Sequence, residues 1–129
     1  MSGIPSVASL GDAPPCGVEL DPIEMPTQSR REKIETMLLD DPRDTFLRYA
    51  LAMELDKEGR HGESLAGLGQ LAADQPPYVP AYFQAAQQLT RLDRVEEART
   101  MLRDGIEAAR VQGDSHAAGE MSEFLASLG

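Results

Sequence analysis

The sequence predicts an all-α fold, in which a short solenoid of helix-turn-helix units follows an extended N-terminal tail. Three observations predict it. Aromatic residues make up only 5% of the 129 residues and tryptophan is absent, which favours close-packed helices over a sheet. Apolar residues recur at helical spacing in segments separated by Pro42, Gly59 and Pro76. Two neighbouring segments also repeat one residue pattern at a fixed interval.

The interval between the two copies is 34 residues. Seven pairs of positions carry the same or a similar residue at this separation, namely Pro42 and Pro76, Leu51 and Ala85, Ala52 and Ala86, Leu55 and Leu89, Arg60 and Arg94, Ser64 and Ala98, and Leu68 and Leu102. A register kept over seven pairs is typical of a repeat architecture. The pattern returns at Ala117, Ala118 and Met121 with an offset of 32, which indicates a shorter connection before the last helix.

Residues 1–28 differ in composition from the rest of the chain. They contain five prolines and four acidic residues, and no lysine or arginine. Proline at this density prevents regular helix, and the low aromatic content cannot offset the ordering entropy. This segment is therefore predicted to be a proline-rich acidic tail, extended or disordered.

The helical domain is predicted over 29–129. A half repeat (29–41) begins at a capping box of Ser29 and Glu32 and ends before Pro42. A first repeat (42–75) has helices at about 44–58 and 61–73, the second weakened by two glycines. A second repeat (76–110) has helices at about 79–91 and 94–109. The terminal helix (114–128) carries one apolar stripe opposite a polar face that includes His116 and Glu120.

The charge of the chain argues against nucleic-acid and membrane partners. The formal net charge is −10, and an acidic surface repels phosphate groups. The one basic triplet, Arg30, Arg31 and Lys33, is interrupted by Glu32 and is interpreted as a solvated helix face. No apolar run reaches the length of a membrane span, and the N-terminus does not have the pattern of a signal peptide. The predicted compartment, by exclusion, is the cytoplasm.

Residue patterns typical of catalysis, metal binding or cofactor binding are missing from the sequence. His61 and His116 lie far apart and are interpreted as solvated residues. Cys16 has only proline, glycine and acidic neighbours, which would not lower its pKa, and is interpreted as an incidental thiol. We therefore expect a protein that is not an enzyme and has no cofactor.

The repeat resembles the tetratricopeptide repeat over about 29–128. The matching positions are a large then a small residue in the first helix, an apolar residue three positions later, a small residue opening the second helix, and a closing proline. There are two departures: Arg48 occupies the position of the aromatic Tyr82, and Leu71 occupies that of the small Gly105. The alternative fold is an irregular antiparallel bundle of four or five helices.

The resemblance implies a module that binds proteins or peptides. In such solenoids the first helix of each pair lines a concave surface. The candidate groove residues are Tyr49, Met53, Lys57, Phe83, Gln84, Gln87 and Arg91, with Gln88 as a further amide. Lys57 and Arg91, also 34 residues apart, would place two cations side by side. Tyr49 and Phe83 could instead be half-buried packing residues. The alternative function is self-association, as a homodimer formed through the groove or an end helix.

The tail offers a ligand for this groove. Residues 17–26 alternate acidic and apolar residues, and their apolar anchors would be Val18, Leu20, Ile23 and Met25. A tethered segment binds effectively even when its intrinsic affinity is weak. The sequence allows two states, a tail held against the helical body and a solvated tail.

Overall fold

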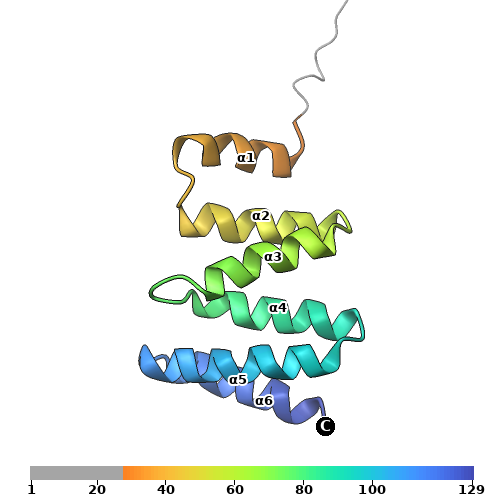
Figure 1. Ribbon diagram of the computed structural model, residues 1–129, viewed down its shortest axis with the longest axis vertical. Helices are drawn as coiled ribbons and strands as arrows, with labels where there is room; N and C mark the ends of the chain where they lie inside the picture. The colour runs from red at the N-terminus through yellow and green to blue at the C-terminus, as the bar shows by residue number, and fades with distance from the viewer. Residues whose placement is uncertain (1–27) are drawn as a thin grey trace, which may run out of the picture. The chain divides into compact units, whose positions relative to one another are not determined.

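A computed structural model describes residues 28–129, which form six helices and no strand (Figure 1). The helices are α1 (Arg30–Asp40), α2 (Thr45–Lys57), α3 (His61–Ala72), α4 (Val79–Arg91), α5 (Val95–Val111) and α6 (Ser115–Ser127). The prediction of an all-α fold is confirmed, and each helix lies where the residue pattern placed it. Cys16 and the predicted tail lie outside the described residues, except for Gln28.

The chain divides into two units, Met1–Lys33 and Ile34–Gly129, of which the first is described only from Gln28 on. In the first unit, the predicted capping box at the start of α1 is confirmed. The Ser29 backbone N–H donates to Glu32 Oε1 at 2.9 Å, and the Glu32 N–H donates to Ser29 Oγ at 3.1 Å. The second unit contains the repeat and is described from here on.

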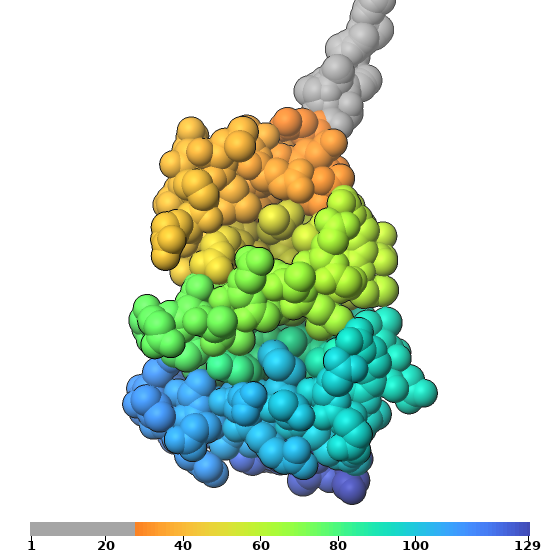
Figure 2. Space-filling view, in the orientation of Figure 1, coloured from red at the N-terminus to blue at the C-terminus, as the bar shows by residue number. Residues whose placement is uncertain are grey.

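In the second unit each helix from α2 to α6 packs against the next one along the chain, and α4 also contacts α6. This stack of antiparallel neighbours is the arrangement of a helical repeat, so the alternative of an irregular bundle is wrong. The second helices, α3 and α5, supply much of the face shown in Figure 2. The first helices, α2 and α4, together with α6, form what is called here the first-helix face.

The same three-residue turn joins the helices at three places. Gly59, Asp93 and Gly113 each adopt a positive φ, of 81°, 63° and 76°. The following residue then donates its N–H to a carbonyl five positions earlier, at 2.8–2.9 Å, as in Arg60 to Leu55. Asp93 takes the left-handed conformation where the other two turns have glycine, because aspartate tolerates this region better than most residues.

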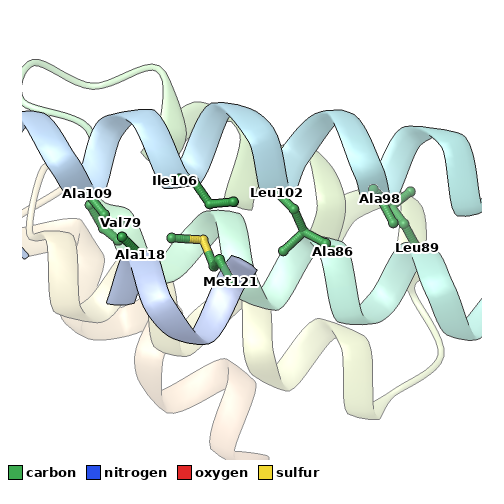
Figure 3. Packing of buried hydrophobic residues seen from close by; sticks show 9 residues of the cluster. All are labelled: Val79, Ala86, Leu89, Ala98, Leu102, Ile106, Ala109, Ala118 and Met121. Carbon is green, nitrogen blue, oxygen red and sulfur yellow. The ribbon is translucent and has the colours of Figure 1, made fainter. Parts of the chain in front are cut away.

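Small residues allow the two helices of a repeat to approach closely. Ala86, Ala98, Leu102 and Ala109 lie in the core with Met121 of α6 (Figure 3). In the preceding repeat, Ser64 replaces Ala98 and donates its buried hydroxyl to the Ala52 carbonyl at 2.6 Å. The repeated small positions of the sequence are therefore buried between the packed helices.

The two departures from the repeat pattern have a physical explanation. A Cβ on Gly105 would lie 2.6 Å from both Met121 Sδ and Tyr82 Cβ, so only glycine fits between α4 and α6 there. Leu71 fills the equivalent position of the earlier repeat and is fully buried. Arg48, which replaces the tyrosine, directs its guanidinium to Asp74, with N–O distances of 2.7 and 3.3 Å.

The final connection explains the change of offset from 34 to 32. α5 continues to Val111, two residues beyond its predicted end, and only three residues separate it from α6. Ala118 and Met121 are buried as Ala86 and Leu89 are, which supports the offset of 32. α4 begins at Val79, which corresponds to position 111 at an offset of 32. Because α6 begins only at Ser115, it lacks the first turn that α4 has.

Candidate functional site

The missing first turn of α6 leaves an opening on the first-helix face, which we call the groove pocket. Its volume is about 140 Å³. Residues of three helices line it, namely Tyr49 of α2, Val79, Pro80, Phe83 and Gln84 of α4, and Asp114, Ala117, Glu120 and Met121 at the start of α6. Three predicted groove residues, Tyr49, Phe83 and Gln84, therefore meet at one cavity.

The two aromatic rings of the groove pocket are also held by packing. Tyr49 lies edge-on to Tyr78, with ring centroids 5.3 Å apart, and Phe83 lies edge-on to Phe124 at 5.8 Å. Such pairs are the preferred arrangement of aromatic quadrupoles. The sequence left open whether these rings line a groove or pack beneath a helix, and the structure shows both: each is half-buried and each borders the cavity.

Tyr49 and Gln84 line the pocket from the two sides of the seam between α2 and α4. Burial raises the pKa of Tyr49 above its ordinary value, the charge of Tyr78 raises it further, and the Gln84 side chain lowers it. The phenol is therefore neutral at physiological pH. Tyr49 therefore borders the cavity as an uncharged side chain.

Two carboxylates lie at the α6 side of the groove pocket. Asp114 caps α6, and its Oδ1 accepts the Ala117 N–H at 3.0 Å. Glu120 Oε2 lies 3.3 Å from His116 Nε2, and both side chains are largely exposed. None of the described residues that line the pocket is a lysine or an arginine. The sequence interpretation missed Asp114, and it placed Glu120 on the exposed polar face of the last helix without assigning it to the site.

The predicted cations lie toward the other end of α2 and α4, outside the groove pocket. Lys57 Nζ lies 3.3 Å from Glu54 Oε2, and Arg91 Nη2 lies 3.0 Å from Asp56 Oδ2. Each of these two cations is thus paired with an acidic residue of α2, which the sequence interpretation did not include.

Asp56 Oδ1 also lies 2.8 Å from His61 Nδ1. His61 is the first residue of α3 and is paired with this carboxylate, so it is not a solvated turn residue. Met53 and Gln87 are partly exposed and lie outside the lining of the groove pocket. Gln88 is 1% exposed, and its amide nitrogen and oxygen have no hydrogen-bond partner among residues 28–129. The idea that Gln88 faces a ligand is therefore wrong.

Comparison with solved structures places the chain in a family. A tetratricopeptide repeat domain protein from Salinibacter ruber is similar in its solution NMR structure, with 34% identity and a TM-score of 0.64 over 68% of this chain and 89% of that one. This chain belongs to the tetratricopeptide repeat family. The crystal structure of the tetratricopeptide repeat domain protein from Salinibacter ruber gives 32% identity and a TM-score of 0.60, over 67% and 96% of the two chains.

A third solved structure, of a protein from Bordetella parapertussis, has 25% identity and a TM-score of 0.66, over 78% of this chain and 88% of that one. No family model matches the sequence, and no curated protein matches it. The tetratricopeptide repeat fold is generally a protein-interaction module. The groove pocket lies on the first-helix face, the face that lines the concave surface of such repeats.

Two other properties of the described part of this tetratricopeptide repeat protein bear on its function. Within residues 28–129, no group of three or more histidine, cysteine, aspartate or glutamate side chains is placed to hold a metal ion. None of the six helices has both the length and the apolar character needed to cross a membrane.

A larger hollow, of about 640 Å³, lies beside the α3–α4 loop, where Arg48 already pairs with Asp74. It contains none of the predicted groove residues. The groove pocket is therefore the candidate site.

Proposed function

We propose that this protein is a non-catalytic adaptor or scaffold that binds a peptide segment of a partner protein along the first-helix face. The observation that carries the proposal is the groove pocket itself. Side chains predicted from two successive repeats, Tyr49 on one and Phe83 and Gln84 on the next, border one cavity with the terminal helix. A cavity of about 140 Å³ suits one side chain of a peptide.

The rest of the face supplies contacts for a peptide that continues beyond the pocket. Gln84 and Gln87 carry amides that can donate to and accept from a peptide backbone. Met53, partly exposed on α2, offers an adaptable apolar contact. Lys57 and Arg91 border the far end of the first-helix face. At a rise of 1.5 Å per residue, Lys57 lies about 12 Å from Tyr49 along α2. The proposal needs no metal, cofactor, nucleic acid or membrane, and places the protein in the cytoplasm.

The proposal is tested by blocking the groove pocket. Peptides that bind the full chain are selected from a random library, and their affinities are then measured for two variants of α6. Ala117→Leu fills the pocket and should weaken binding at least tenfold. Ala126→Leu makes the same change at an exposed position of the same helix and should leave affinity unchanged. Equal affinities for the two variants, both shown to be folded by thermal melting, would refute the groove as the binding site.

Self-association is the second candidate function, and one observation favours it. Leu39, near the end of α1, is 81% exposed, and Phe46 at the start of α2 is 71% exposed. A second copy of the chain could cover these side chains through its own end helix. Light scattering during gel filtration would show a dimer that Leu39→Glu and Phe46→Glu convert to a monomer. A monomer at micromolar concentration for the unaltered chain removes this candidate.

A further inference from the structure

The groove pocket has a charge of one sign. Asp114 and Glu120 lie at its α6 side, and its remaining lining residues are uncharged. Oδ1 of Asp114 is used by the helix cap, while Oδ2 has no partner among the described residues. Among the described residues, the one ion-pair partner of Glu120 is His116, whose side chain is 85% exposed. Both carboxylates can therefore accept further hydrogen bonds from a ligand.

The surroundings of the pocket strengthen this field. No lysine or arginine follows Arg110 in the sequence, whereas Asp114, Glu120 and Glu123 all lie in that stretch. The nearest cations predicted for the face, Lys57 and Arg91, are paired with Glu54 and Asp56. Within residues 34–129, no lysine or arginine is among the residues that line the pocket. An acidic ligand would be repelled there.

The rings of Tyr49 and Phe83 line the groove pocket on the side of α2 and α4. Aromatic rings attract cations through their quadrupole, and a guanidinium group also stacks on them. An arginine side chain has an apolar methylene stem and a head that is a planar cation. A cavity with two rings on one side and two carboxylates on the other therefore suits both parts of this side chain.

We propose that the groove pocket receives the side chain of an arginine from the partner protein. This inference rests on the proposed function and adds the chemistry of the ligand. Residues 1–28 contain no lysine or arginine, so the tail of the same chain cannot supply the cation. The partner is accordingly a protein with an accessible basic segment, which the net charge of −10 would also attract.

Peptides selected from a random library against the full chain test the proposal. Binders that depend on an unblocked pocket should share an arginine at one position. Replacing that arginine by citrulline, its neutral isostere, should weaken binding about tenfold. Lysine should restore only part of the loss, because it carries the positive charge but lacks the planar fork of arginine. Raising the salt concentration should weaken the arginine peptide more than the citrulline peptide.

Matched variants of the protein locate the charge. Glu120→Gln should weaken the arginine peptide about 2- to 5-fold, as expected for an exposed ion pair, and should leave the citrulline peptide unaffected. Glu123→Gln, on the same helix but outside the pocket, should change neither. Asp114→Asn keeps a capping side chain and should act as Glu120→Gln does, whereas Asp44→Asn alters the equivalent cap of α2, away from the pocket, and should have no effect.

The outcomes separate this proposal from the one on which it depends. Binders that Ala117→Leu weakens but that lack a basic residue, or tolerate citrulline, would overturn the arginine assignment and leave the groove as the binding site. Binders that ignore Ala117→Leu would overturn both proposals.

Discussion

At the scale of single residues, Gln88 is the least satisfied side chain of the described core. Its neighbours on the same stripe of α4 face α2, since Gln84 lines the groove pocket with Tyr49 and Arg91 donates to Asp56. Gln88 lies between them, buried, with both amide atoms unpaired. A buried polar group without a hydrogen bond costs about 1–3 kcal/mol.

Replacing Gln88 by methionine should therefore stabilise the protein. The two side chains have similar volumes, so the change removes the unpaired amide without leaving a cavity, and we expect a gain of about 1–2 kcal/mol. Gln87→Met, at the partly exposed neighbouring position, is the control and should change stability by less than about 0.5 kcal/mol. Urea unfolding measures both. A Gln88→Met protein less stable than the unaltered chain would show that the amide has a partner in solution.

Asp93 adopts a backbone conformation that lowers the stability of the protein. Its φ of 63° lies in the left-handed region, which costs a residue with a Cβ about 1–2 kcal/mol. Asp93→Gly should stabilise the protein by about 0.5–1 kcal/mol, part of the gain being offset by the greater freedom of glycine in the unfolded chain. The reverse change at the equivalent turn, Gly59→Asp, should destabilise it by a similar amount. Thermal melting that moves both variants in the same direction would contradict this account of the turn.

At the scale of helices, stability depends on the close approach of α4 and α5. Ala86 is fully buried in the cluster that includes Ala98 and Leu102. Ala86→Leu should destabilise the protein by about 1–3 kcal/mol, because a larger side chain forces the two helices apart. Ala126→Leu makes the same change at an exposed position of α6 and should have little effect. Chemical unfolding distinguishes them, and equal stabilities would mean that the assigned helix register is wrong.

The sequence predicted this level of organisation well, for a physical reason. Local periodicity predicts the burial of Ala52, Leu55, Ala86 and Leu89, and the same apolar spacing occurs in both copies of the repeat. The rims of the groove depend on contacts between helices and on where α6 begins, which periodicity does not record. The ion pair of Arg91 with Asp56 crosses from α4 to α2. The offset of 32 was the one signal that could have revealed the groove pocket, because it shows that α6 starts late.

At the scale of the whole molecule, the N-terminal segment is the remaining candidate ligand of the first-helix face. We propose that residues 17–26, through Val18, Leu20, Ile23 and Met25, compete with a partner for this face. The cations expected to attract the tail are already paired, and the groove pocket is acidic, so apolar contacts must supply the attraction. A tether raises the local concentration of the tail to about millimolar, which lets weak contacts compete.

Removing residues 1–28 tests this competition. A chain that begins at Ser29 should bind a groove-directed peptide several-fold more tightly than the full chain and should melt at a slightly lower temperature, because it has lost an intramolecular ligand. A full-length control with Val18, Leu20, Ile23 and Met25 changed to serine keeps the tail's length and charge, and should behave as the shortened chain does. If instead this control behaves as the unaltered protein while the shortened chain binds more tightly, the charge of the tail and not its apolar anchors governs access. Equal melting temperatures and equal affinities for all three proteins would leave residues 1–28 with no part in the binding equilibrium.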